Sequence, residues 1–196
     1  MARMKVPHLI LASASPRRAE LLRSAGIQFT VDVADIAEDV HAGESSVEHA
    51  ERLAREKAEV VAERNPGKIV LGADTIVVVD EQILGKPRNA QDAAGMLRSL
   101  SDRTHEVMTG VCIARLETGN WKLETSAERT KVQFSRLSSS DIEAYIATRE
   151  PMDKAGAYAI QGIASRWITR IEGDYANVVG LPVALVWQML QKFTSG

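Results

Sequence analysis

The stretch IVLGADTIVVV, residues 69–79, is the most hydrophobic run of the chain and the one that decides the fold. Its apolar residues are mostly β-branched and do not alternate with polar ones, which predicts a central strand buried on both faces. One acidic residue, Asp74, lies in the middle of this run. A buried carboxylate costs several kcal/mol unless it is hydrogen-bonded, paired with a cation or bound to a metal. Asp74 is therefore either a residue that accepts backbone N–H groups at a strand break created by Gly72, or, as we favour, an active-site base or metal ligand.

The segments on both sides of this strand alternate between helical and strand-like patterns. Helical periodicity covers residues 16–25, 46–64, 90–100, 140–148 and 182–193, and strand-like runs cover residues 9–11, 28–33, 68–79, 105–116, 121–134 and 166–171. Strands and helices interleave in the first half of the chain, whereas two long strands follow one another in the middle. This mixture predicts an α/β fold with a mixed sheet. Since no repeat or Pro/Gly/Ser-rich linker interrupts the chain, we expect a single domain over residues 1–196.

The composition is that of an ordinary globular protein. The 196 residues are 45% hydrophobic and 26% charged and carry a net charge of −2, so no overall positive charge favours nucleic acid or an anionic membrane. Cys112 is the only cysteine, which excludes an intramolecular disulfide and favours the reducing cytoplasm. The four histidines have no metal-ligand spacing, so zinc is not expected. The apolar run within residues 1–15 is too short to span a membrane, and we expect no signal peptide because the run continues into the next motif.

Two arginines stand at the start of a predicted helix, where acidic residues are usual. In LASASPRRAELL, residues 11–22, Ser15 is a natural N-cap and Pro16 a natural first residue of a helix, and Arg17 and Arg18 follow at once. The free N–H groups already make this end of a helix positive, so acidic residues are preferred there by up to about 1 kcal/mol. We interpret the two arginines as complementary to a bound polyphosphate, which the N–H groups and guanidinium groups would hold together.

Two lysines and an acidic loop are further candidates for the same site. Lys57 lies inside the apolar stripe of the helix that precedes the central strand, either as a side chain that extends to water or as a cation that holds an anion. Lys86 stands between glycine and proline in the motif GKPR, either on a surface turn or within reach of the same anion. The acidic loop DIAED, residues 35–39, is either solvated or, together with Asp74, offers oxygen ligands to Mg²⁺ or Mn²⁺ shared with substrate phosphates.

Several motifs together resemble the Maf family of nucleoside triphosphate pyrophosphatases. They run in this order through nearly the whole chain: LASASPRRAELL, RLAREKA, GADTIVVVD, GKPRNAQDAAGML, DKAGAYAIQG and NVVGLPVALV. The resemblance implies an elongated α/β fold with a long, curved mixed sheet flanked by helices and two lobes around a cleft, similar to inosine triphosphate pyrophosphatases. It also implies a cytoplasmic enzyme, often a homodimer, that needs a divalent cation and hydrolyses a nucleotide to its monophosphate and pyrophosphate.

The resemblance also assigns roles to single residues. Asp74 matches the family's proton acceptor, and Glu38 matches the acidic residue associated with the metal, so that both are expected metal ligands. The subfamily that acts on dTTP and UTP carries Arg, Thr and Gln at three positions, which are Arg17, Thr75 and Gln161 here, whereas the 7-methyl-GTP subfamily has Trp, Gln and Glu. The Gln161 amide offers the donor and acceptor that the O4 and N3–H edge of uracil and thymine requires. The residues that match phosphate-binding positions are Ser13, Arg17, Arg18, Lys57 and Lys86.

We therefore expect a hydrolase of acid anhydrides that acts on dTTP, UTP and related modified pyrimidine nucleotides in a house-cleaning role. Two alternatives remain beside this hypothesis. One is the same chemistry on 7-methyl-GTP or another modified nucleotide. The other is a non-enzymatic regulator of cell division and septum formation, which would bind nucleic acid or a division partner. The net charge of −2 argues against nucleic acid, and a set of two carboxylates and four cations would have no use in a pure binding module.

Overall fold

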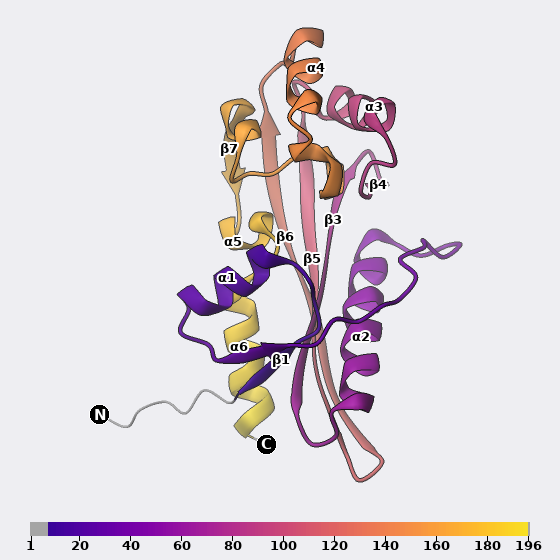
Figure 1. Ribbon diagram of the computed structural model, residues 1–196, viewed down its shortest axis with the longest axis vertical. Helices are drawn as coiled ribbons and strands as arrows, with labels where there is room; N and C mark the ends of the chain where they lie inside the picture. Colours follow the sequence, from indigo (N-terminus) through magenta and orange to yellow (C-terminus); the bar gives the residue numbers. More distant parts are fainter. Residues whose placement is uncertain (1–7, 196) are drawn as a thin grey trace. The chain divides into compact units, whose positions relative to one another are not determined.

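The computed structural model describes residues 8–195, and Figure 1 shows its elements. The strands are β1 (Leu9–Leu11), β2 (Phe29–Val31), β3 (Ile69–Val79), β4 (Gln82–Leu84), β5 (Thr104–Glu117), β6 (Asn120–Phe134) and β7 (Ile168–Glu172). The helices are α1 (Pro16–Ser24), α2 (Ser46–Arg64), α3 (Ala90–Leu100), α4 (Ser139–Ala147), α5 (Tyr175–Val179) and α6 (Val183–Ser195). Short 3₁₀ helices cover Glu150–Asp153, Ala155–Ala157 and Ile163–Trp167. Within the described range no helix is long and apolar enough to cross a membrane, and residues 1–7 of the N-terminal stretch considered above lie outside that range.

The strands form a mixed sheet, which confirms the predicted fold class. Their order is β2-β1-β3-β5-β6-β7, with β4 paired to β3. β1 pairs in parallel with both β2 and β3, while β4 and β7 pair antiparallel with β3 and β6. Parallel neighbours need a crossover, and α1 and α2 lie in the two crossovers. β5 and β6 are joined by a tight turn in which Thr118 and Gly119 both have positive φ, as two-residue hairpins require.

The chain forms two compact units. Within the described range, the first contains residues 8–74, 109–128 and 180–195, and the second contains residues 75–108 and 129–179. The boundary falls inside β3, directly after Asp74. The single domain over residues 1–196 and the cleft between two lobes stay predictions.

Each unit has an apolar core of its own. In the first, residues of β1, β3 and β5 alternate between two faces of the sheet, because successive side chains of a strand point in opposite directions. One face packs against α1 and α6, and the other packs against α2. In the second unit, α3 and α4 pack against the strand residues of that unit around Val132 and Phe134. The first unit carries the sequence-predicted residues from Ser13 to Asp74.

Two glycines allow α2 to lie directly on the sheet of the first unit. A Cβ atom on Gly72 of β3 would lie 2.1 Å from the backbone oxygen of Ala54, and one on Gly110 of β5 would lie 2.1 Å from the backbone oxygen of Ala50. No real Cβ tolerates such contacts, so only glycine permits this approach. The close packing brings the helix face that carries Lys57 onto the strand that carries Asp74.

Candidate active site

The carboxylate in the middle of β3 is paired with a buried ammonium group. Lys57 Nζ donates to Asp74 Oδ1 at 2.6 Å and to Glu38 Oε1 at 2.6 Å. Asp74 and Lys57 are only 7% and 8% exposed, whereas the Glu38 side chain is 43% exposed. The interpretation of Lys57 as a side chain that extends to water is therefore wrong. β3 also continues through Gly72 without a break, so Asp74 is stabilised by a cation from α2 and not by the end of a strand.

Arg18 is a second buried cation, and it binds backbone atoms of the same unit. Its Nε donates to Gly180 O at 2.8 Å, and its Nη1 donates to Ala73 O at 2.8 Å and to Ser13 Oγ at 3.0 Å. A guanidinium group offers several donors in a fixed plane, so it can join several segments at once. Because Ala73 directly precedes Asp74, Arg18 fixes the backbone of β3 next to the Asp74 carboxylate.

Arg18, near the start of α1, lies within electrostatic reach of both carboxylates. Ser15 caps the helix as predicted, with its hydroxyl accepting from the backbone N–H of Arg18 at 3.5 Å. Burial has the largest influence on the pKa of Arg18 and lowers it; the charges of Asp74 and Glu38 raise this pKa, and the charge of Arg17 lowers it. Arg17 itself is half-buried. Asp74, Glu38 and Arg17 therefore all act electrostatically on Arg18, and the binding of an anion at the SPRR motif stays a prediction.

The two carboxylates that share Lys57 have the chemistry of a hard-cation site. Carboxylate oxygens are the ligands that Mg²⁺ and Mn²⁺ prefer, and Mg²⁺ is usually held by one or two carboxylates together with substrate phosphates. Among residues 8–195, no group of three or more His, Cys, Asp or Glu residues gathers to hold an ion by itself. Glu38 and Asp74 are the carboxylates that would hold such a cation together with a ligand, and a cation at this place stays a prediction.

The family is decided by comparison with known proteins. A family model described as "Maf-like protein" matches residues 8–193. The chain belongs to the Maf family. A dTTP/UTP pyrophosphatase of Koribacter versatilis (strain Ellin345) is 53% identical to this Maf-family chain over 184 residues, which cover 94% of the chain and 93% of the relative. A dTTP/UTP pyrophosphatase of Citrifermentans bemidjiense is 53% identical over 188 residues, which cover 96% of both.

The resemblance inferred from the motifs is confirmed by these matches. Among solved structures, the Ham1 protein of Staphylococcus aureus has a TM-score of 0.46 and 14% sequence identity over 94% of this chain and 98% of that chain. That likeness is too low to argue from, so the mixed sheet of the Maf-family chain rests on its own strand pairing.

The remaining predicted site residues of the Maf-family chain belong to the second unit. Thr75 is the first residue of that unit and is half-buried, while Lys86 and Gln161 are exposed. Lys86 follows β4 in the connection to α3. The joint action of these three residues with Asp74 stays a prediction.

The backbone on both sides of Gln161 is anchored, which sequence reasoning did not foresee. The Tyr145 hydroxyl accepts from the backbone N–H of Ala159 at 3.3 Å and donates to Glu150 Oε1 at 2.9 Å. The same Glu150 oxygen accepts from the backbone N–H of Ile163 at 3.1 Å. Burial and the bond to Glu150 raise the pKa of Tyr145, so the phenol keeps its proton and can donate. Gln161 therefore stands on a segment that is held at two points.

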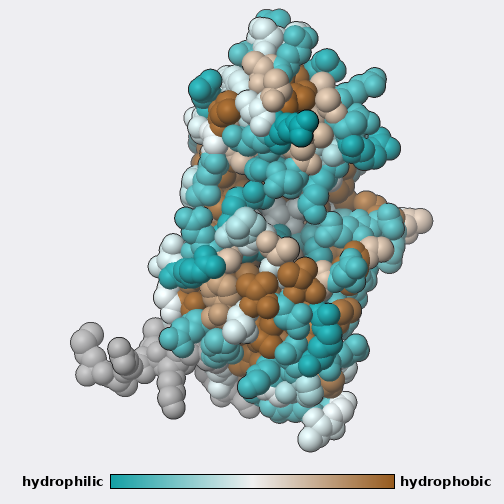
Figure 2. All heavy atoms as spheres, viewed as in Figure 1, coloured by the Kyte–Doolittle hydropathy of each residue, from teal (hydrophilic) through white to brown (hydrophobic). Residues whose placement is uncertain are grey.

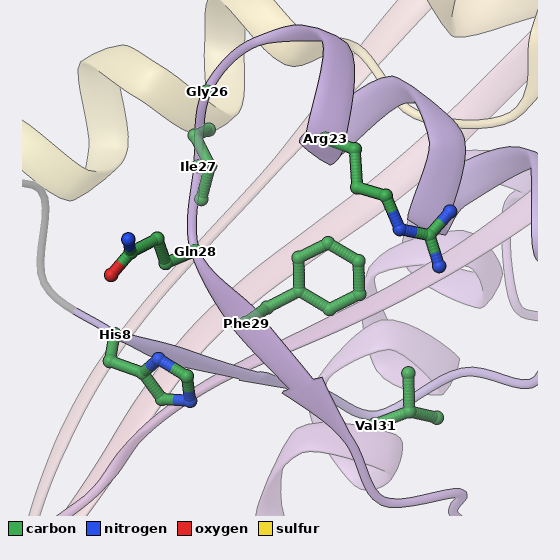
Figure 3. Close-up of a pocket in the computed structure, with 7 residues that line it drawn as sticks. All are labelled: His8, Arg23, Gly26, Ile27, Gln28, Phe29 and Val31. Carbon is green, nitrogen blue, oxygen red and sulfur yellow. The ribbon is translucent and has the colours of Figure 1, made fainter.

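A separate groove of about 580 Å³ lies in the first unit, and none of the predicted site residues lines it (Figure 3). The Arg23 guanidinium from α1 lies 5.5 Å from the centre of the Phe29 ring of β2, at one side of this groove. Most of the surface in Figure 2 is hydrophilic, and apolar side chains gather over β2 and the segment after it, where Val31 and Val33 are about half exposed. The residues that line this groove include no carboxylate that could accept a proton, so Asp74 and its partners form the better candidate site.

Proposed function

We propose that this Maf-family protein hydrolyses dTTP and UTP to the monophosphate and pyrophosphate. The observation that carries the proposal is the buried contact of Asp74 with Lys57, in a cluster with Glu38 and the arginines at the start of α1. A buried carboxylate beside several cations is suited to a reaction that takes up a polyphosphate and moves a proton. The choice of nucleotide is supported by relatives named dTTP/UTP pyrophosphatase, which are 53% identical over more than nine-tenths of the chain.

The phosphates would bind where α1 begins. The first N–H groups of a helix have no partners within it, and the helix dipole attracts negative charge to this end. Arg17 and Lys57 add two positive charges that offset the charge building on the leaving pyrophosphate. Because Nε and Nη1 of Arg18 donate to protein atoms, this residue adds charge and holds Ser13 and the backbone before Asp74 in place. We extend the phosphate-binding role to Lys86 of the second unit.

The proton acceptor would be Asp74. One of its oxygens accepts a hydrogen bond from Lys57 Nζ, which fixes the orientation of the carboxylate, and the other oxygen would take a proton from the attacking water. Glu38 and Asp74 would hold Mg²⁺ or Mn²⁺ together with the substrate phosphates. When bound, such a cation neutralises phosphate oxygens and lowers the pKa of a water molecule.

Base selection and assembly complete the proposal. Gln161 would pair with the O4 and N3–H edge of uracil or thymine through its amide, with Thr75 and Arg17 as the other selective positions. We further propose a cytoplasmic homodimer that binds neither nucleic acid nor membrane, in keeping with the net charge of −2.

A panel of nucleotides tests the function. The purified protein is incubated with dTTP, UTP, CTP, dATP and 7-methyl-GTP, each with Mg²⁺ or Mn²⁺, and released pyrophosphate is measured. Preferred turnover of dTTP and UTP, and none without a divalent cation, is the expected result. Preference for 7-methyl-GTP would assign the chain to the sister activity, and no hydrolysis of any nucleotide would restore the hypothesis of a non-enzymatic regulator.

A further inference from the structure

A partly buried ion pair joins α2 to the loop that precedes it. Arg52 Nε lies 2.6 Å from Glu44 Oε1, and Arg52 Nη2 lies 3.0 Å from Glu44 Oε2, so the pair is bidentate. The two side chains are only 12% and 8% exposed. The bond from Arg52 is the main cause that lowers the pKa of Glu44 to about 2. Two-pronged, charge-assisted bonds of this kind are stronger and more directional than single ion pairs, and we call this pair the Arg52–Glu44 clamp.

The clamp also holds the loop backbone next to Glu38. Arg52 Nη2 donates to the carbonyl oxygen of Asp39 at 2.8 Å. Glu44 Oε2 accepts from the backbone N–H of His41 at 3.2 Å and lies 3.0 Å from His49 Nδ1. The segment from Asp39 to Glu44 is therefore fixed to the first half of α2 at several points.

The Glu38 side chain is joined to α2 through Lys57. Lys57 Nζ lies 2.6 Å from Glu38 Oε1, and the Glu38 side chain is 43% exposed, so this end of the loop lies at the surface. The neighbouring residue, Asp39, is held through its carbonyl oxygen by the Arg52 guanidinium. Two consecutive loop residues thus contact α2, one through the proposed metal-binding carboxylate and the other through the clamp.

We infer that Arg52 and Glu44 are positioning residues that keep the Glu38 carboxylate ready for divalent-cation and nucleotide binding. The inference rests on the proposed function and adds residues that do not touch the reacting atoms. Preorganisation of this kind removes the cost of ordering a loop when the ligand binds. Loss of the clamp is therefore expected to weaken cation and nucleotide binding, with little change in the chemical step once both are bound.

The test compares Arg52→Ala and Glu44→Gln with Arg55→Ala. Arg55 lies on the same helix, but its side chain is 51% exposed and its partner Glu59 is 4.0 Å away, so it is a matched control. Both clamp variants should raise the half-saturating Mn²⁺ concentration and the KM for UTP by about tenfold, a difference of about 1.4 kcal/mol. Their kcat should change by less than about threefold, as expected for a positioning role, and Arg55→Ala should match the wild type. A loss confined to kcat would overturn the inference.

A double-mutant cycle shows whether the clamp acts through Glu38. If it does, Arg52→Ala has no further effect on cation dependence in a Glu38→Ala background, whereas fully additive effects contradict the inference. Should Arg52→Ala not fold, Glu44→Gln enters the same cycle. Hydrogen exchange gives a readout that needs no activity. The backbone amides of residues 38–44 should exchange faster in the clamp variants than in the wild type, and at the wild-type rate in Arg55→Ala. Unaltered exchange refutes the clamp, while a wild type that hydrolyses no nucleotide refutes only the proposed function.

Discussion

Asp74 and Lys57 are, at the scale of single residues, a charged pair inside an otherwise apolar region. Removing one member of a buried pair leaves the other charge without a partner, which is strongly destabilising. Such a pair is weak evidence for stability, since apolar residues of similar size would pack as well or better. The presence of this pair on the most hydrophobic strand of the chain therefore indicates a role in function and not in stability.

Asp74→Asn tests the role of this carboxylate. The amide has nearly the same shape but cannot accept a proton, so turnover of UTP should fall at least roughly 100-fold while nucleotide binding persists. Turnover is measured by pyrophosphate release and binding by calorimetry. Asp80→Asn, at the exposed turn after β3, is the matched control and should leave turnover unchanged. Near-normal turnover of Asp74→Asn would remove this residue from the mechanism.

His105 makes the stability of the second unit depend on pH. It is 2% exposed, its ring lies edge-on to Phe134 and Tyr158, and its Nε2 is 2.7 Å from the Tyr158 hydroxyl. Burial lowers its pKa from 6.5 to about 4, so between these values the unfolded chain binds a proton that the folded chain does not. The contribution of neutral His105 to the free energy of unfolding is complete above about pH 6.5. It is lost as the pH falls, by about 2 kcal/mol at pH 5. Urea unfolding at pH 7 and pH 5 measures this loss of unfolding free energy. The loss should be smaller in His105→Gln than in the wild type, and equal losses in both would contradict the assignment.

Among the contacts between helices and strands, the packing of α2 on the sheet decides where Lys57 lies. Gly72→Ala places a Cβ 2.1 Å from the backbone oxygen of Ala54 and 2.8 Å from the backbone nitrogen of Ala58. Neither backbone atom can move without the helix, so the variant should lose about 1–3 kcal/mol of unfolding free energy and most of its activity through displacement of Lys57. The measurement is urea unfolding with a parallel activity assay.

Gly95→Ala is the control for this substitution. Gly95 lies in α3, and a Cβ there meets nothing within 4 Å. Alanine has a higher helix propensity than glycine, so the variant should gain up to about 1 kcal/mol. If both variants behaved alike, close approach at Gly72 would not be the cause of its effect.

Binding of a polyphosphate should stabilise the whole molecule, although its net charge is −2. The arginines at the start of α1 and Lys57 place positive charge at one site, and a ligand that binds only the folded state stabilises it by mass action. At a pyrophosphate concentration 100 times its Kd the gain is about 2.7 kcal/mol, which corresponds to a rise of roughly 5–10 °C in Tm. Thermal unfolding with pyrophosphate, and with sulfate at equal ionic strength, measures the effect. Arg17→Ala should reduce the shift, and an unchanged Tm of the wild type would count against the site.

Helices and strands that carry capping residues or a clear hydrophobic period were predictable from the sequence, and those that lack them were not. The bounds of α2 and α3 match the prediction, because Ser45 and Asn89 cap these helices with their own side chains. The strand expected over residues 28–33 pairs only over Phe29–Val31, since pairing depends on a neighbouring strand. β4 was missed because three residues after a turn carry no recognisable period.

The sequence by itself determined the α/β class, the family and the kinds of chemical group at the candidate site, since these follow from hydrophobic periodicity, capping residues and motifs. Only the tertiary structure decided which groups meet: that Lys57 bridges Asp74 and Glu38, that Arg18 holds the backbone before Asp74, and that Arg52 and Glu44 clamp the loop. The physical reason is that periodicity reports which face of an element is buried. The distances between charges on different elements are set by how closely helix and sheet pack, as at Gly72 and Gly110.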